Sequence, residues 1–231
     1  MKLSVLIRTK NEGAWIGRCL ESVFDQDLPG LEVVVVDNES TDDTREILRR
    51  FDCRVVTVSE ADFTHGGSIN QGIEASQGDL VAILSGHCIP AHDKWLWRLA
   101  LNFHEPQVAG AYGRQEPLPD TSDFDKRDLW TTFGQDRRVQ VQDDFFHNAN
   151  SMVRRSVWAQ VPFNETLAGV EDRDWARRVL DLGHSVVYEP AASVYHYHGI
   201  HHGRDEARAA RVARVIELIR TGRVEEVPER A

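Results

Sequence analysis

The sequence predicts an α/β fold in a single domain, with a mostly parallel central sheet flanked by helices. In the first half of the chain, short apolar runs typical of buried strands alternate with segments whose apolar residues recur at helical spacing. Repeated β-α-β units of this length form a right-handed, mostly parallel sheet. A length of 231 residues, with 41% hydrophobic and 28% charged residues, fits one sizeable globular domain.

The elements of the first half follow from local signals. The run Glu32–Val36 is almost continuously apolar, as expected for a strand covered on both faces. Pro29 and Gly30 end the helix before it, and Ser40 with Asp43 resembles the N-cap of the helix after it. The expected order is strand Leu3–Ile7, helix Asn11–Asp25, strand Glu32–Val36, a helix from Ser40 through Phe51, strand Arg54–Val58, helix Ser68–Ser76 and strand Asp79–Leu84.

The pattern changes from about Arg114. The segment Gln115–Phe145 is rich in Asp, Arg and Gln and has weak periodicity, which indicates loops and short helices. Helical spacing returns later, and a glycine at position 183 is typical of the residue just beyond a helix. The elements expected here are helix Glu171–Leu182, strand Ser185–Tyr188 and a last amphipathic helix, Arg204–Arg220.

Composition and charge argue against several classes of function. A formal net charge of -10 argues against nucleic acid as the main partner, because a phosphate backbone needs a basic face. The three cysteines, Cys19, Cys53 and Cys88, form no CxxC pair, which fits a reducing compartment. The first residues are too weakly apolar for a signal peptide, and no run approaches membrane-spanning length, so we expect a cytoplasmic protein.

Polar loops follow three of the expected strands, where α/β proteins usually bind ligands. The loop Arg8–Glu12 suits a nucleotide or an anion, but simple helix capping explains it equally well. The loop Asp37–Ser40 offers a carboxylate to a ribose hydroxyl or a base N–H, or else forms an Asx turn with a helix cap. The loop Leu84–Pro90, "LSGHCIP", presents Ser85 and His87 where enzymes that hold a metal-bound diphosphate often carry acidic residues.

Two further groups of side chains have both a functional and a structural interpretation. His196 and His198 point to the same side of an extended chain, so both can face one ligand. With His201 and His202 they can also form a solvated surface tract, but their place after a predicted core strand favours function. The acidic pair Glu171-Asp172 opens a helix, where negative charge alone is favourable.

Seven segments in register resemble family 2 glycosyltransferases with the GT-A fold: "SVLIRTKNE", "VVVVDNESTDDT", "HGGSINQG", "DLVAILSGHCIP", "VAGAYGRQ", "FFHNANSMVRRSVW" and "VEDRDWARRVLDLGHSVVYEPAASVYHYH". The bacterial rhamnosyltransferase-like branch, with its HGG-x-x-N-x-G, YGRQ and H-x-H segments, is the most similar. The resemblance covers about residues 3–200. It implies a GT-A domain over 1–203, with a nucleotide-binding half at about 1–113 and an acceptor half at about 114–203, before a helix and tail over 204–231.

The resemblance also implies roles for individual residues. The donor would be a TDP-, UDP- or GDP-linked sugar, moved with inversion to a hydroxyl of a glycan, lipid-linked or small-molecule acceptor. Asp172 would take the proton from that hydroxyl, and Glu171 would orient the acceptor or the base. His147 and Asn148 would line the pocket without an assigned role. The donor site would comprise Thr9, Asn11, Glu12, Asp37, Asn38, His65, Gly66, Gly67, Asn70, Ser85, Arg114 and Gln115.

His87 is a departure from the family, whose members usually place an acidic metal ligand there. Imidazole is a good ligand for Mn²⁺ or Zn²⁺ and a poor one for Mg²⁺, so the expected cofactor is a divalent cation, Mn²⁺ before Mg²⁺. His87, His196 and His198 are the expected ligands. The alternatives are direct contact of His87 with the diphosphate, or a non-catalytic nucleotide-sugar-binding homologue that has lost its acidic ligand. The retained Glu171-Asp172 pair and H-x-H count against that homologue.

Two other enzyme classes fit less well. A sugar nucleotidyltransferase would carry a Gly-rich, basic loop near its N-terminus, which "RTKNEGAW" does not provide. A histidine-based hydrolase would show HExxH-type spacing. The last helix bears a basic stripe that favours either a solvated surface helix packed on the domain, which we prefer, or peripheral contact with the inner face of a membrane or a lipid-linked acceptor. The stripe comprises Arg204, Arg208, Arg211, Arg214 and Arg220.

Overall fold

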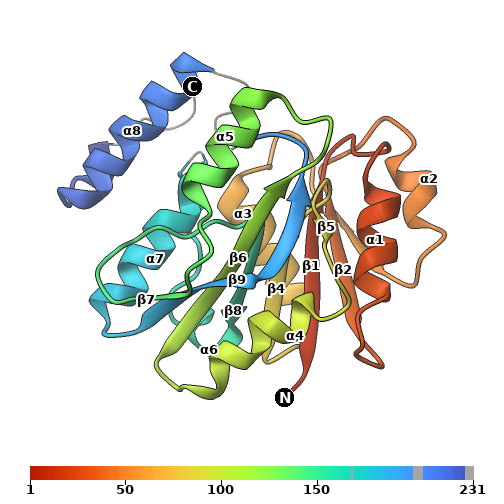
Figure 1. Cartoon of the computed structure of the whole chain (residues 1–231), viewed down its shortest axis with the longest axis horizontal. Coiled ribbons are helices and arrows are strands. Elements are labelled where there is room, and N and C mark those ends of the chain that lie inside the picture. Colours follow the sequence, from red (N-terminus) through yellow and green to blue (C-terminus); the bar gives the residue numbers. More distant parts are fainter. Residues whose placement is uncertain (168, 200–204, 227–231) are drawn as a thin grey trace.

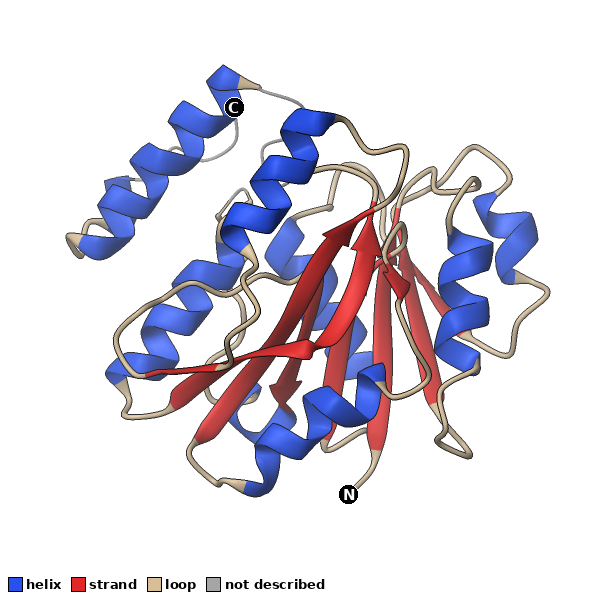
Figure 2. Cartoon of the chain, in the orientation of Figure 1, coloured by secondary structure: helices blue, strands red, loops and turns tan. Residues whose placement is uncertain are grey.

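The computed structural model describes residues 1–167, 169–199 and 205–226, and confirms the predicted α/β fold. A nine-stranded sheet lies between two layers of helices, as Figures 1 and 2 show. The strands are β1 Leu3–Thr9, β2 Glu32–Asp37, β3 Arg54–Thr57, β4 Leu80–Ser85, β5 Ile89–Pro90, β6 Val108–Pro117, β7 Arg138–Gln140, β8 Asn150–Arg154 and β9 Ser185–His196. The helices are α1 Ile16–Phe24, α2 Thr44–Leu48, α3 His65–Ala75, α4 Trp95–Ala100, α5 Asp123–Thr132, α6 Arg155–Trp158, α7 Glu171–Asp181 and α8 Glu206–Arg220, with 3-10 turns at Leu101–His104 and Val224–Glu226.

The strand order is β3-β2-β1-β4-β8-β6-β9-β5, and β7 pairs with β9. The pairs of β1 with β2 and β4, of β2 with β3 and of β6 with β9 are parallel. β8 is antiparallel to both of its neighbours, β4 and β6, and β5 and β7 are antiparallel to β9. β1, β2, β3, β4, β6 and β9 therefore run in one direction, which makes the sheet mostly parallel.

Alternate residues of the central strands point into two apolar clusters, one on each face of the sheet. Val5 and Ile7 pack with α1 and α4 on one face. Leu6, between them in the sequence, packs on the other face with α3, α6 and α7. Both faces of the central strands are covered, which explains their nearly unbroken apolar runs.

The first predicted helices are shorter than expected, because their polar first residues form loop contacts. The segment predicted to be helical from Asn11 starts only at Ile16, since Asn11 has a left-handed backbone with φ of 54°. The helix predicted from Ser40 starts at Thr44. Ser40 does not cap it, because the Ser40 hydroxyl accepts a hydrogen bond from the Asn11 N–H.

The chain after β4 holds more regular structure than the sequence indicated. α4, β6 and β8 were not predicted, and β9 continues eight residues beyond Tyr188 to His196. Glycines that the packing requires interrupt the side-chain pattern of β6, so the sequence does not indicate a strand there. A Cβ on Gly113 would lie 1.9 Å from the Ala192 carbonyl oxygen, and one on Gly110 would lie 2.9 Å from the Trp175 ring.

The C-terminal helix α8 packs on the domain through one face, as the preferred interpretation predicts. Val215 and Ile219 are buried against Leu167 and Val170. Arg204 and the side chain of Arg208 lie outside the described residues, and a membrane contact of this helix stays a prediction. Within residues 1–167, 169–199 and 205–226, no helix combines the length and apolarity needed to cross a membrane.

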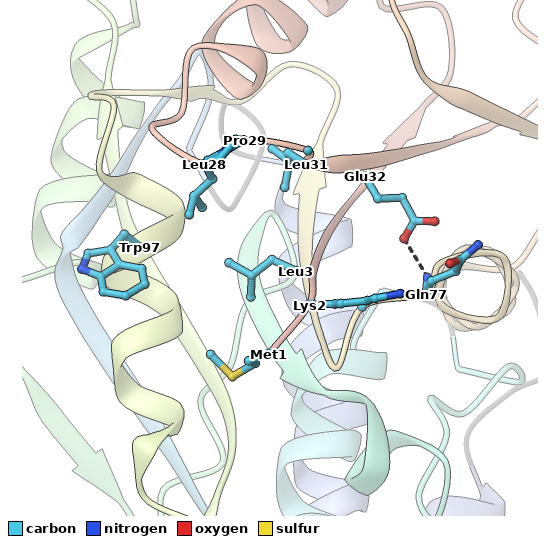
Figure 3. A pocket seen from close by; sticks show the side chains of 11 residues that line it. Met1, Lys2, Leu3, Leu28, Pro29, Leu31, Glu32, Gln77 and Trp97 are labelled. Atoms are coloured by element: carbon cyan, nitrogen blue, oxygen red, sulfur yellow. Dashed lines mark hydrogen bonds between the residues drawn. The ribbon is translucent and has the colours of Figure 1, made fainter.

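A hollow of about 610 Å³ lies at the amino-terminal ends of β1 and β2 (Figure 3). Leu3, Leu28, Leu31 and Trp97 supply its apolar lining. Although it is larger than the cavity described below, it lies at the end of the sheet away from the loops that bind ligands in α/β folds. Its lining brings together few titratable side chains, so we place the candidate site elsewhere.

Candidate active site

A cavity of about 210 Å³ lies at the carboxyl ends of β1 and β4. The ends meet there because β1 and β4 are parallel neighbours, with Arg8 opposite Ser85. Segments from both halves of the chain complete the wall, since β8 and β9 are inserted in the same sheet. The lining residues are Arg8, His65, Ser85, His87, His147, Asn148, Ala149, Gly169, Glu171, Asp172, His196 and His198.

Three histidines form the most concentrated group in this cavity. One nitrogen from each of His87, His196 and His198 lies within 4.8 Å of the other two. The Nε2 atoms of His87 and His196 are 3.0 Å apart, and their rings stack at 4.9 Å between centroids. The H-x-H segment is therefore beside the His87 loop, although 109 residues separate His87 from His196.

Hydrogen bonds orient two of these rings for binding a cation. His87 Nδ1 lies 2.6 Å from Glu12 Oε1, so Nδ1 carries the proton and donates to the carboxylate. His198 Nδ1 donates to the Gly199 carbonyl at 2.8 Å. Both contacts leave Nε2 as the lone-pair atom, which is the usual outer-shell arrangement of metal-binding histidines. Burial lowers the pKa of His198, which favours the neutral ligand form.

The chemistry of this donor set fits a divalent transition metal. Three imidazole nitrogens are borderline ligands that suit Mn²⁺ or Zn²⁺ better than Mg²⁺, which prefers oxygen. The nitrogens converge within the span of one coordination sphere. His87, His196 and His198 are therefore the described residues best placed to hold such an ion.

The H-x-H segment is fixed from both sides through Tyr197. Its ring stacks on Trp15 at 5.2 Å between centroids and meets His87 edge-on at the same distance. Its carbonyl accepts a hydrogen bond from Thr121 Oγ1 at 3.0 Å. Neither Trp15 nor Thr121 carries a motif signal in the sequence that would predict this role.

The carboxylates of Glu171 and Asp172 begin α7 and face the same cavity. Asp172 accepts backbone hydrogen bonds from Arg173 at 2.8 Å and from Asn148 at 3.3 Å. Desolvation and, second, the Glu171 charge nevertheless raise the pKa of Asp172 to about 7. A carboxyl with that pKa can accept a proton at neutral pH and release it again.

Arg8 is a cavity residue to which the sequence analysis gave no individual role. Its Nη1 lies 3.8 Å from Glu171 Oε1. Its Nε is buried and has no hydrogen-bond partner within the described parts of the chain. A buried guanidinium with an unused donor suits an anionic or hydroxyl-rich ligand. The sequence signal that could have indicated this role is the charge of Arg8 itself, near the end of an otherwise largely apolar strand.

His147 differs from His87 and His198 in its tautomer. Its Nδ1 accepts from Gln115 Nε2 at 3.0 Å and from the Ala149 N–H at 3.3 Å. The ring proton is therefore on Nε2, which makes this histidine a hydrogen-bond donor. Gln115 itself is fully buried behind it and does not line the cavity.

Several predicted donor-site residues lie outside this cavity and contact other protein groups. Asp37 is fully buried, 2.6 Å from Arg45 Nε. Asn11 Oδ1 accepts from the Thr41 N–H at 2.7 Å. Glu12 is not a lining residue, and its carboxylate accepts the hydrogen bond from His87 Nδ1. Thr9 and Asn38 are buried at the ends of β1 and β2, and Arg114 Nη1 lies 3.7 Å from Glu116.

Within the HGG segment only His65 reaches the cavity. A Cβ on Gly66 would lie 2.3 Å from the Asn164 carbonyl oxygen, so this glycine allows close packing of α3 on the loop 163–165. Asn70 donates to the Phe163 carbonyl and accepts from Trp158 Nε1, both at 2.9 Å. Gly66, Gly67 and Asn70 therefore pack behind the cavity wall and do not line the cavity.

The family model described as "Glycosyl transferase family 2" matches residues 4–161 of this chain. The chain belongs to glycosyl transferase family 2. A relative in Salmonella anatum, "O-antigen chain rhamnosyltransferase WbaN", is 28% identical over 178 residues, which are 72% of this chain and 56% of the relative. "Glycosyltransferase AglE" of Haloferax volcanii is 31% identical over 196 residues, 80% of this chain and 64% of that protein.

A third relative, "O-antigen chain rhamnosyltransferase RfbN" of Salmonella typhimurium, is 24% identical over 86% of this chain and 67% of its own length. The chain thus spans 56% to 67% of these three relatives. Two of these relatives are rhamnosyltransferases of bacteria, which confirms the predicted likeness to the bacterial rhamnosyltransferase-like branch.

Solved structures confirm the GT-A fold. Mannosyltransferase PcManGT from Pyrobaculum calidifontis, in complex with GDP-Man and Mn²⁺, has a TM-score of 0.72 and 19% identity over 99% of this chain and 66% of that chain. S. aureus TarS 1-349 in complex with UDP-GlcNAc has a TM-score of 0.68 and 18% identity, over 94% of this chain and 67% of that chain.

Proposed function

We propose that this family 2 chain transfers a sugar from a nucleotide-diphosphate donor to a hydroxyl of a growing glycan or lipid-linked acceptor, with inversion at the anomeric carbon. One observation carries the proposal. A single cavity at the carboxyl edge of the sheet holds three converging histidines together with a carboxyl whose pKa is raised to about 7. A cation site and a general base are the two parts that this reaction requires.

The transfer is a direct displacement in which one bond forms as another breaks. The acceptor oxygen attacks the anomeric carbon, and the bond from that carbon to the donor phosphate breaks, so the nucleoside diphosphate leaves with the electron pair. Asp172 takes the acceptor proton. Arg8, next to Glu171, would donate to donor oxygens or sugar hydroxyls. A cation held by His87, His196 and His198 would supply positive charge to the leaving diphosphate.

The cavity is too small for the whole donor, so the donor would occupy the cavity and a neighbouring surface. Pockets for drug-sized ligands occupy roughly 300–1,000 Å³, and this cavity has about 210 Å³. It therefore suits the sugar and diphosphate, while the nucleoside would lie over the loops after β1 and β2. Two of the relatives are O-antigen chain rhamnosyltransferases, which supports a deoxyhexose donor and a cell-surface glycan acceptor.

The first experiment is calorimetric binding of UDP, TDP, GDP and CDP, each with Mn²⁺, with Mg²⁺ and with EDTA. Binding of one nucleotide that requires Mn²⁺ supports a histidine-held cation and names the donor class. Equal binding in EDTA would mean that His87 contacts the diphosphate directly. Absence of binding under every condition would contradict the transferase proposal.

A catalytic protein is distinguished from a non-catalytic nucleotide-sugar-binding homologue by turnover. We expect the wild type to consume the donor identified above and Asp172→Asn to bind it without turnover. Donor binding with no turnover in the wild type, tested with glycan and lipid-linked acceptors, would favour the non-catalytic alternative.

A further inference from the structure

The loop before α7 lies between the cavity and the C-terminal helix α8. Leu167 and Val170 are 2% and 1% exposed and pack against Val215 and Ile219 of α8. Gly169, between them in the sequence, lines the cavity with φ of 77°. The loop thus contacts α8 with its apolar side chains and the active site with its backbone.

The first turn of α7 needs such external support. Val170, its N-cap residue, makes no side-chain capping hydrogen bond. Without a cap, the first N–H groups of a helix lack a partner within it and the turn frays more easily. Glu171 and Asp172 are the first two residues of that turn, so fraying would displace both carboxylates.

A second contact joins α8 to the same turn through Asp144. This carboxylate is 3% exposed and lies 3.5 Å from Arg173 Nη1 and 3.3 Å from Arg220 Nη2. The Arg173 guanidinium also lies over the Phe145 ring, 4.7 Å from its centroid. The Arg173 N–H in turn donates to Asp172 Oδ1 at 2.8 Å.

We infer that Arg220 is a positioning residue: through Asp144 and Arg173, α8 holds the first turn of α7, and with it Asp172, in the geometry that transfer requires. A buried carboxylate is stable only when cations compensate its charge. Asp144 therefore favours the arrangement in which both Arg173 and Arg220 lie next to it. The consequence for catalysis depends on the proposed function. The family model ends at residue 161 and includes neither helix.

Three variants test this inference. Arg220→Gln removes the charge from a side chain that is 56% exposed, so the fold should persist. Arg220→Lys keeps the charge, and Arg214→Gln is the matched control on an exposed position of the same helix. Hydrogen exchange of the amides of residues 174–177, beginning with the Asp174 N–H that donates to the Val170 carbonyl, reads the first turn directly, and amides of β4 report global stability.

We expect Arg220→Gln to accelerate exchange at 174–177 about tenfold, with β4 unchanged. Its kcat should fall about tenfold, with the nucleotide Kd unchanged, because misplacement of a reacting group lowers the rate of the chemical step. Arg220→Lys should recover part of both effects, and Arg214→Gln should behave as the wild type.

Unchanged exchange at 174–177 in Arg220→Gln would overturn the inference, and so would equal acceleration in β4. If exchange accelerates locally but the wild type transfers no sugar, the support of α7 stands and the proposed function fails. If the wild type is active and Arg220→Gln keeps its full kcat, Arg220 does not position the base.

Discussion

His87 determines the chemical character of the cavity, because its two ring nitrogens have different neighbours. Nδ1 donates to Glu12, and Nε2 faces His196 and the interior. An aspartate at this position would present oxygen ligands instead. We therefore expect His87→Asp to move the metal preference from Mn²⁺ toward Mg²⁺, measured by binding of both ions with the nucleotide present. An unchanged preference would remove His87 from the metal shell.

Glu12 should control metal affinity without touching the ion. Glu12→Gln removes the charged acceptor of the His87 Nδ1–H and weakens the orientation of that ring. Loss of such an outer-shell carboxylate typically lowers metal affinity about 10- to 100-fold. Manganese titration of the protein without substrate measures the effect, with Glu46→Gln on the exposed surface of α2 as control. Equal affinities of Glu12→Gln and wild type would contradict this role.

Asp172 should give the reaction an acidic limb near neutral pH. The base must be ionised, and its pKa is raised to about 7, so kcat/KM should fall as the pH drops below that value. A pH profile measured at constant ionic strength checks this. A profile that stays flat down to pH 5 would exclude Asp172 as the base.

The same residue should lower the stability of the fold at high pH. Its folded pKa is above the ordinary value of 3.8, so the folded state retains the proton that the unfolded state loses, and stability falls as pH rises from about 4 to about 7. Asp172→Asn removes this loss and should raise the free energy of unfolding at pH 8 by at most about 4 kcal/mol, and much less at pH 4. Denaturant titrations at both pH values measure the difference.

At the scale of elements, α3 depends on glycine for its position. The Cβ of an alanine at residue 66 would lie 2.3 Å from the Asn164 carbonyl oxygen, a backbone atom that cannot move away without shifting the loop. Gly66→Ala should therefore cost about 1–3 kcal/mol of unfolding free energy, the usual range for overpacking. Gly134→Ala is the control, because no atom lies within 4 Å of the added Cβ. Equal stability of the two variants would contradict the packing argument.

The parallel strands explain why the site lies at this edge of the sheet. β1 and β4 end side by side, and their polar residues begin where the apolar runs stop. β9 then brings the H-x-H segment to the same edge, because it runs parallel to β6 in the same sheet. These site residues therefore lie on strand ends or directly after them, close to the cavity.

For the whole molecule, binding at the site should couple to stability. The proposed cation ligands and the acidic pair come from both halves of the chain, so a ligand that bridges them favours the folded state over the unfolded one. At a concentration about 100 times Kd a ligand adds about 2.7 kcal/mol, which corresponds to roughly 5–11 °C in Tm for a protein of this size. We expect Mn²⁺ with the matching nucleotide to raise Tm more than either alone. A thermal scan in which the pair adds nothing would contradict a joint site.

Local patterns were sufficient for the order of strands and helices up to β4. The continuous apolar run of β2 and the helical spacing that precedes it predict the β-α-β order, since burial on both faces leaves only apolar residues acceptable. For the same reason the predicted strand ends Ile7, Val36 and Leu84 fall within two residues of the observed ends Thr9, Asp37 and Ser85. β6 and β8 escaped prediction because glycines and a buried asparagine, Asn150, interrupt their apolar pattern to meet tertiary neighbours.

The sequence by itself determined which residue types reach the carboxyl edge of the sheet, because alternation and strand ends are local properties. Only the tertiary structure decided which of them meet. Glu12 lies 75 residues from His87, and Arg8 comes close to Glu171 only when α7 is docked. Such pairs depend on the register and packing of strands that are distant in the chain, and no local periodicity encodes them. The link between α8 and the first turn of α7 has the same origin, since Asp144 joins Arg173 and Arg220 through the fold alone.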